Sequence, residues 1–331
     1  MPEGLGRLAA AALRRLGWAV LVVWVVATIV FVALRATGDP LEAVLGGPGS
    51  QAGDEAVAAA RAQYGLDQPL FVQYVLQLWH VATLQLGDSY SRKQPVLDLI
   101  GAQVPNTLLL ATLALVTAWL LALVGVTAVG RRGRAGRALD RAASAVATVA
   151  TVTPQFWLGA LLIVVLVTRA GWLPATSAGN SPAELALPVV TLAVPTAGYL
   201  FHVLHDALLE ADAAPFAATS YARGASRSWV LTRHTLRHAS LPALALTGWA
   251  YGSLLSGAVV VESLFARPGL GRLLLDAATQ RDVPLVIGAV VVVALVYVIV
   301  IALTDLAEHL LDPRLTDNRA AAAPVELAVG A

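Results

Sequence analysis

The chain has no cysteine among its 331 residues and only one lysine, Lys93. Without thiols it can form no disulfide, no thiolate metal site and no cysteine nucleophile. A phosphate-binding P-loop needs a lysine directly after a glycine, and Lys93 follows Arg92. If ATP powers the activity of this chain, a separate chain must therefore hydrolyse it.

Charged residues are also scarce. They make up 13% of the chain, against 58% hydrophobic residues, and the mean hydropathy is +0.73. A soluble domain cannot bury so much apolar surface, so the composition predicts an all-α polytopic membrane protein. The net charge of +1 gives no overall field that would attract nucleic acid.

Six apolar runs predict six transmembrane helices. The first run is longer than the core of a signal peptide and ends in the charged stretch 35–40, so we expect it to stay uncleaved. Pro154 in the third run frees a backbone carbonyl and predicts a kink or break. The expected spans are residues 16–34, 108–129, 142–168, 185–204, 241–261 and 285–303.

These spans divide the chain into four parts. Helical apolar spacing in residues 56–64 and 69–84 predicts two short helices in the second part. The expected parts are the N-terminus with the first helix (1–35), an extracytoplasmic segment (36–104), a transmembrane domain with helices 2–6 (105–312) and a polar tail (313–331).

The distribution of basic residues predicts the orientation. Most of the 22 Lys and Arg residues lie in the N-terminus, in the loops 130–141 and 205–240 and in the tail. Positive charge collects on the cytoplasmic side, so we expect both termini and these loops to be cytoplasmic.

Residues 216–242 form a basic, partly apolar stretch between two expected spans, and their spacing predicts a helix, a break at Gly224 and a second helix. Such a stretch can be simply a topology signal, because basic residues collect on the cytoplasmic side, or it can lie on the lipid surface. The order of its residues suggests a third interpretation. It contains the runs Ala222-Arg223-Gly224-Ala225-Ser226 and Arg233-His234-Thr235-Leu236-Arg237-His238-Ala239-Ser240-Leu241-Pro242.

These runs resemble the loop, named EAA, by which bacterial ABC-importer permeases dock onto their ATPase. They are most similar to the dipeptide/oligopeptide/nickel subgroup of these permeases. The glutamate that names the loop is absent here, because Ala218 occupies its place. Further stretches of this chain resemble motifs of the same subgroup and occur in the same order. They are residues 65–74, 86–91, 154–159, 169–175, 187–193, 260–271 and 311–314.

The resemblance implies a type I ABC-importer permease fold in a bacterial cytoplasmic (inner) membrane. It implies that the chain is no enzyme, binds no cofactor and forms half of a pathway for di- and oligopeptides by alternating access. The implied partners are a second homologous permease, two ABC ATPase subunits or one fused pair that hold ATP and Mg, an extracytoplasmic substrate-binding protein and membrane lipid, with no nucleic acid.

The resemblance also assigns the coupling to the ATPase. A short helix near residues 221–229 is expected to lie in a groove of the ATPase and to pass its movement to spans four and five. The expected coupling residues are Tyr221, Ala222, Arg223, Gly224, Ala225, Ser226, Arg227 and Trp229.

Further polar residues in or near the spans are candidates for the translocation pathway or for packing. Glu262 has two interpretations. It can contact an outer gate or the binding protein, together with Phe265, Pro268, Gly269 and Gly271, or it can be a solvated carboxylate at the membrane boundary. The candidate pathway residues are Thr153, Gln155, Tyr199, Thr247, Tyr251 and Ser253. Each of them could instead form a hydrogen bond to a neighbouring helix.

Two spacings have simple structural explanations. His202 and His205 lie three residues apart, which could suit a metal ion, but no third ligand is evident, so we expect interfacial cations or hydrogen-bond donors. Small residues at Gly248, Gly252 and Ser256 predict close approach of a neighbouring helix.

Other functions remain open at this point. Within the importer class, the substrate could be nickel, a metallophore or haem. A secondary transporter would need buried carboxylates and inverted repeats, and the expected spans hold almost no acid. The sequence contains no HExxH or GxSxG pattern, which argues against an intramembrane enzyme.

Overall fold

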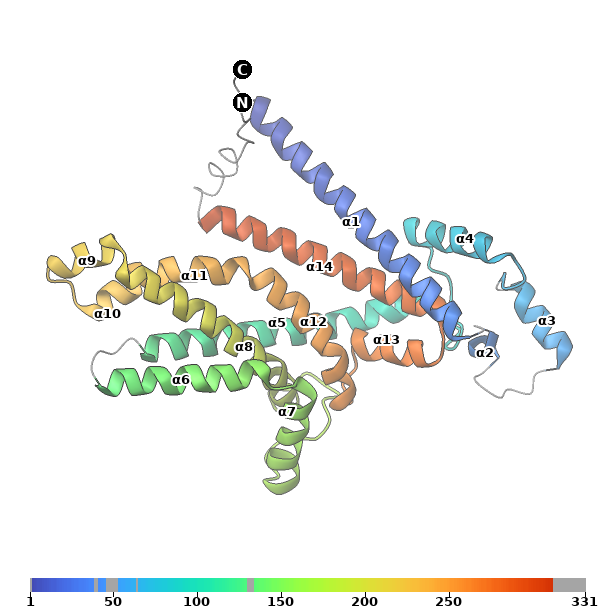
Figure 1. Cartoon of the computed structure of the whole chain (residues 1–331). Coiled ribbons are helices and arrows are strands. Elements are labelled where there is room, and N and C mark those ends of the chain that lie inside the picture. The colour runs from blue at the N-terminus through green and yellow to red at the C-terminus, as the bar shows by residue number, and fades with distance from the viewer. Residues whose placement is uncertain (1, 39–40, 46–52, 64, 130–133, 312–331) are drawn as a thin grey trace, which may run out of the picture. The chain divides into compact units, whose positions relative to one another are not determined.

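The computed structural model describes residues 2–38, 41–45, 53–63, 65–129 and 134–311 (Figure 1). Within these residues the chain is helical, and its only β-type pairing is an isolated bridge between Asp88 and Pro95. The all-α prediction is therefore confirmed. The tail 313–331 lies outside the described residues.

The two short helices expected in 56–64 and 69–84 lie close to those positions, and several other helices are longer than the expected spans. The described helices are α1 Pro2–Thr37, α2 Leu41–Val44, α3 Asp54–Gln63, α4 Leu70–Ala82, α5 Val96–Val129, α6 Arg134–Val152, α7 Gln155–Leu162, the π-helical segment η1 Ile163–Arg169, α8 Pro182–Ala213, α9 Pro215–Ala222, α10 Arg227–Val230, the π-helical segment η2 Leu231–Thr235, α11 Leu236–Ala245, α12 Thr247–Leu264, α13 Leu270–Thr279 and α14 Val283–Leu311.

Four described helical stretches are long and apolar enough to cross a membrane, namely Gly17–Ala36, Val96–Ala128, Pro182–Ala213 and Val283–Thr304. Two bent pairs raise the possible number to six. The pair Gly136–Val152 and Gln155–Arg169 bends by 103°, and the pair Arg227–Ala245 and Thr247–Leu264 bends by 51°. The count of six spans thus stays a prediction.

The predicted break at Pro154 is confirmed, since Pro154 has extended backbone between α6 and α7. The expected third span over 142–168 is covered by α6, α7 and η1 on the two sides of this break, because a proline cannot donate the backbone hydrogen bond that would join the two helices. The fifth span is also interrupted. Its helix ends at Ala245 and restarts at Thr247.

The helix that contains the second expected span is longer than 108–129. Helix α5 starts at Val96, inside the segment 36–104, because Val96 and Ile100 are buried in a hydrophobic cluster and packing extends the helix. The fourth span is likewise longer than 185–204, since α8 continues to Ala213 with Leu208 and Ala211 buried.

The chain falls into two compact units. Unit 1 comprises residues 1–114, 154–192 and 253–298, and unit 2 comprises residues 115–153, 193–252 and 299–331. The core of unit 1 joins α1, α13 and α14 to the start of α5, with Phe31, Ile100, Leu273 and Ile287 among its buried side chains.

Asp282 connects two distant stretches within unit 1. Its buried Oδ2 atom accepts hydrogen bonds from Ser89 Oγ at 2.5 Å, Ser91 Oγ at 2.7 Å and the Ser91 amide at 2.9 Å. Its Oδ1 atom accepts from the Leu285 amide at 3.3 Å, in the first turn of α14. The stretch around Ser89 is therefore more than a connection between spans.

We expect Asp282→Ala to lower the free energy of unfolding by about 2 kcal/mol, because it leaves the buried Ser89 hydroxyl and the first turn of α14 without their acceptor. Thermal unfolding of the purified chain in detergent measures the effect. The exposed Asp67 gives a matched control. Equal melting temperatures for Asp282→Ala and Asp67→Ala would contradict this assignment.

Candidate functional site

The stretch after α8 folds as two helices joined by a tight turn, as the sequence predicts (Figure 1). Helix α9 ends at Ala222, and Gly224 has a left-handed φ of 83°. The Gly224 amide donates to Tyr221 O at 3.0 Å, and the Ala225 amide donates to Ser220 O at 3.1 Å. These two bonds form a Schellman motif, which closes a helix with glycine in the left-handed conformation.

Glycine is needed at position 224 for its backbone and not for space. A Cβ atom placed there would meet nothing within 4 Å, yet a side chain at this φ is strained. The chain then turns into α10, where Ser226 Oγ accepts from the Trp229 amide at 3.4 Å as N-cap. The predicted helix–break–helix pattern around Gly224 is thus confirmed, and the stretch 221–229 contains the end of α9, the turn and the start of α10.

The turn presents an open groove on the surface of unit 2. The groove has a volume of about 660 Å³. Arg223 is exposed, and Trp229 is 49% exposed while its ring lies 4.9 Å from that of His234. The groove is lined by Ser220, Arg223, Gly224, Ala225, Ser226, Trp229 and His234. Five of the eight expected coupling residues therefore lie together.

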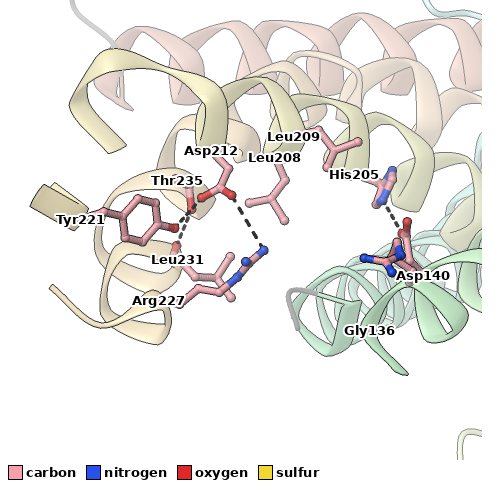
Figure 2. Close-up of a pocket in the computed structure, with 11 residues that line it drawn as sticks. Gly136, Asp140, His205, Leu208, Leu209, Asp212, Tyr221, Arg227, Leu231 and Thr235 are labelled. Atoms are coloured by element: carbon pink, nitrogen blue, oxygen red, sulfur yellow. Dashed lines mark hydrogen bonds and ion pairs between the residues drawn. The ribbon is translucent and has the colours of Figure 1, made fainter. Parts of the chain in front are cut away.

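Two other expected coupling residues contact the end of α8 instead. Tyr221 Oη donates a hydrogen bond to Asp212 Oδ1 at 2.6 Å, and Arg227 Nη2 lies 3.8 Å from Asp212 Oδ2 (Figure 2). The remaining one, Ala222, ends α9 and is exposed. Ala218, which replaces the glutamate of the EAA pattern, is exposed as well.

Asp212 was not identified from the sequence. It lies outside the motif runs, and an acid in a polar stretch gives no signal of its own. The same holds for Asp140, whose Oδ1 atom lies 2.8 Å from His205 Nε2. His202 Nε2 lies 3.2 Å from Thr148 Oγ1, so both histidines hydrogen-bond, as expected. No group of three or more potential metal ligands occurs in the described part of the chain.

A second cluster, in unit 1, surrounds Glu262 near the end of α12. The Glu262 side chain is fully buried, so the interpretation as a solvated carboxylate is wrong. Its Oε1 atom accepts from Thr107 Oγ1 at 2.6 Å, and its Oε2 atom accepts from the Arg272 amide at 3.0 Å. The carboxylate thereby lies at the N-terminus of α13, where backbone amides favour an anion.

Close packing around this carboxylate and the Val259 backbone explains the glycines of the 260–271 motif. A Cβ atom at Gly269 would overlap the Glu262 carboxyl group, and one at Gly271 would lie 2.5 Å from Val259 Cα. Thr107 completes the turn, because its Oγ1 also accepts from the Leu270 amide at 2.8 Å. Glycine is therefore required here for close approach and not for an unusual φ.

Arg267 was also missed, although it interrupts an apolar stretch. Its buried guanidinium donates from Nη1 to Ser177 Oγ at 3.0 Å and to Gly179 O at 2.7 Å, and from Nη2 to Asn180 Oδ1 at 2.7 Å. Burial lowers the pKa of Arg267, while the carboxylates of Glu262 and Glu184 raise it. Arg267 fixes the loop 177–180 to the turn before α13.

The other expected residues of this outer cluster lie around the same turn. Phe265 is buried, and its carbonyl oxygen accepts from the Ser177 amide at 2.9 Å. Pro268 and Gly269 line a cavity of about 250 Å³ together with the charged side chains of Arg92, Arg272 and Asp276. The structure thus brings together all five residues expected at the outer gate.

The candidate pathway residues belong to both units, and most have local partners. Thr153, directly after α6, donates from Oγ1 to Val149 O of that helix at 2.6 Å, and Gln155 packs against Gly257. Tyr199 lies 4.7 Å from Trp249, ring to ring, and Thr247 Oγ1 accepts from Trp119 Nε1 at 3.3 Å.

The last two candidates differ in burial, since Tyr251 is buried and Ser253 is exposed. The pathway assignment of all six residues stays a prediction.

Gly248 lies close to Thr304 of α14. A Cβ atom placed at Gly248 would lie 3.3 Å from Thr304 Oγ1, so the predicted close helix packing is confirmed at this glycine.

Comparison with known proteins identifies related permeases. Residues 122–317 match the family described as binding-protein-dependent transport system inner membrane component. A putative peptide transport system permease protein of Brucella abortus is 33% identical over 91% of this chain and 97% of its own. The glutathione transport system permease protein GsiC of Salmonella paratyphi A is 31% identical over 91% and 97% of the two chains.

A solved structure shows the same fold. The MetNI methionine ABC transporter in inward-facing conformations contains a chain that matches 68% of this chain and 97% of its own, with a TM-score of 0.50 and 22% identity.

We expect Glu262→Ala to lower the free energy of unfolding by about 3 kcal/mol, because it leaves the buried Thr107 hydroxyl and the Arg272 amide without an acceptor. Glu262→Gln keeps one acceptor oxygen and should lose less. Thermal unfolding in detergent measures both, with the exposed Glu55→Ala as control. A Glu262→Ala protein that melts like the control would show that the carboxylate does not hold α13.

Proposed function

Because the chain belongs to the family of binding-protein-dependent transport system inner membrane components, we propose that it forms half of the translocation pathway of an ATP-driven peptide importer. The chain is an ABC transporter permease of the peptide-transport type and a multi-pass membrane protein. In the proposed mechanism, separate ATPase subunits hold ATP and Mg, and this chain performs no covalent chemistry.

One observation supports the coupling mechanism above all others. The residues 223–226 form an exposed turn that is closed on one side by the Schellman motif and on the other by the Ser226 cap. In the proposed mechanism, these hydrogen bonds hold the turn to both helices, so a force applied to it moves the flanking helices as a body. The groove with the exposed Arg223 and Trp229 offers a cation and an aromatic ring to the partner.

The proposed cycle follows from this turn. Closure of two ATPase subunits on ATP pushes the turn 223–226, and α8 and α11 transmit the displacement to the transmembrane helices. The translocation pathway then opens alternately to the two sides of the membrane. This follows because the helix bundle has two packings, and ATP and substrate stabilise these packings to different extents. We further propose that both termini face the cytoplasm, which places the turn on the same side as the ATPase.

Short peptides are the substrate class that the relatives support. The names of the related permeases refer to peptide and glutathione transport. Glutathione is a tripeptide, so these substrates share the peptide bond. The proposed partners are a second homologous permease for the other half of the pathway, two ATPase subunits or one fused pair, and an extracytoplasmic substrate-binding protein.

Affinity purification of the tagged chain from native membranes in mild detergent tests the proposed assembly. We expect mass spectrometry to identify a second permease and one or two P-loop ATPases in amounts comparable to the chain. Trp229→Ala should reduce recovery of the ATPases but not of the second permease, because it removes an exposed ring from the groove. Recovery of the stable chain alone would contradict the importer assignment.

We expect Gly224→Leu to leave the amount of chain in the membrane unchanged and to lower ATP-driven peptide uptake about tenfold, while ATP hydrolysis continues. The reason is that leucine disfavours the left-handed φ and displaces the turn. Uptake and hydrolysis are measured on reconstituted complexes.

Gly171→Leu is the matched control, since Gly171 has a φ of 65°, lies in unit 1 and has equally open surroundings. It introduces similar backbone strain outside the coupling turn. Normal uptake in the Gly224→Leu protein would contradict the proposed role of the turn.

A further inference from the structure

One face of α8 contacts two other parts of unit 2 near the end of the helix. His205, Leu208, Leu209 and Asp212 are spaced at i, i+3, i+4 and i+7, so they lie on the same side of the helix. All four line a cavity of about 130 Å³, together with Asp140 of α6 and with residues of α9, α10 and η2. Figure 2 shows His205 beside Asp140, and Asp212 between Tyr221 and Arg227.

We propose that Asp212 is the positioning residue that couples the turn 223–226 to α8. This inference rests on the proposed function, because it names the residue through which movement of the turn reaches the transmembrane bundle. Two contacts converge on the Asp212 carboxylate.

The two contacts come from opposite sides of the turn. Tyr221 precedes Gly224 and donates to Oδ1 at 2.6 Å, whereas Arg227 follows Gly224 and lies 3.8 Å from Oδ2. One carboxylate on α8 therefore holds the last turn of α9 and the first turn of α10 together. A rotation or displacement of the turn must carry Asp212 with it or break both contacts.

The chemistry of the contacts suits this role. A phenol that donates to a carboxylate at 2.6 Å forms a charge-assisted hydrogen bond, which is shorter and stronger than a neutral one. Asp212, Tyr221 and Arg227 are each partly buried, so water competes less for these groups than at an exposed site. Asp212 is thus held by one directional bond and by one longer ion pair.

The face of α8 continues the connection to α6. His205 lies two helical turns before Asp212, and its Nε2 atom is 2.8 Å from Asp140 Oδ1 of α6. Leu208 between them is buried. Movement of the turn therefore has a continuous route of packed and hydrogen-bonded side chains from α9 and α10 through α8 to α6.

The first test measures how firmly Asp212 holds the turn, through the protection of its backbone amides from exchange. Amide hydrogen exchange of the purified chain in detergent should be faster in residues 215–226 for Asp212→Ala than for the wild type. Glu210→Ala is the matched control, because Glu210 is an exposed acid on the same helix. Unchanged exchange in the Asp212→Ala protein would overturn the positioning role, whatever the chain transports.

The second test measures coupling in the reconstituted complex with its ATPase subunits. We expect Asp212→Ala to lower peptide uptake per ATP hydrolysed about fivefold, and Glu210→Ala to leave this ratio unchanged. Tyr221→Phe should lower the ratio by a smaller factor. Adding Tyr221→Phe to Asp212→Ala should cause no further loss, because both changes remove the same bond. Asp212→Glu, which keeps the carboxylate, should retain more of the ratio than Asp212→Ala.

The outcomes separate this inference from the proposed function. If the wild-type complex drives ATP-dependent uptake and Asp212→Ala behaves like Glu210→Ala, only the role of Asp212 is refuted. If the wild-type chain with its partners shows no ATP-dependent uptake, the proposed function is refuted, and the coupling role of Asp212 with it. The hydrogen-exchange result then still decides whether Asp212 positions the turn.

Discussion

Every break between helices leaves backbone amides and carbonyls without partners, and in an apolar surrounding each of them must be satisfied locally. The tight turns of this protein meet that constraint with a small number of side chains. Glu262 occupies the N-terminus of α13, Asp282 closes the start of α14, and Ser226 caps α10. The Schellman motif at Gly224 closes α9 with backbone groups alone.

The two carboxylates, of Asp282 and Glu262, also connect stretches that are far apart in the chain. Asp282 binds Ser89 and Ser91, and Glu262 accepts from Thr107. Buried carboxylates are costly unless they accept several hydrogen bonds, and each of these accepts at least two. Glu262 and Asp282 therefore hold loops of unit 1 in place, which accounts for these two buried acids without assigning them to ion transport.

The proposed function places different demands on unit 2. A permease that receives force from an ATPase needs an exposed surface for contact and a stiff connection behind it. The groove at 223–226 supplies the surface, and the contacts of Asp212 with Tyr221 and Arg227 supply the connection. Of the eight expected coupling residues, five thus line the groove, and Tyr221 and Arg227 contact Asp212 of α8.

The sequence by itself determined the helical membrane class, the break at Pro154, the helix–glycine–helix pattern around Gly224 and the resemblance to importer permeases. These features depend on composition, local backbone preference and residue order, all of which are readable along the chain. The sequence could not determine that Glu262 lies against Gly269 and Gly271, that Asp212 contacts both Tyr221 and Arg227, or that α5 begins at Val96. Only the tertiary structure decided these points, because each depends on which side chains are brought together by packing, and a lone acid or a short apolar run has no local signature of its distant partner.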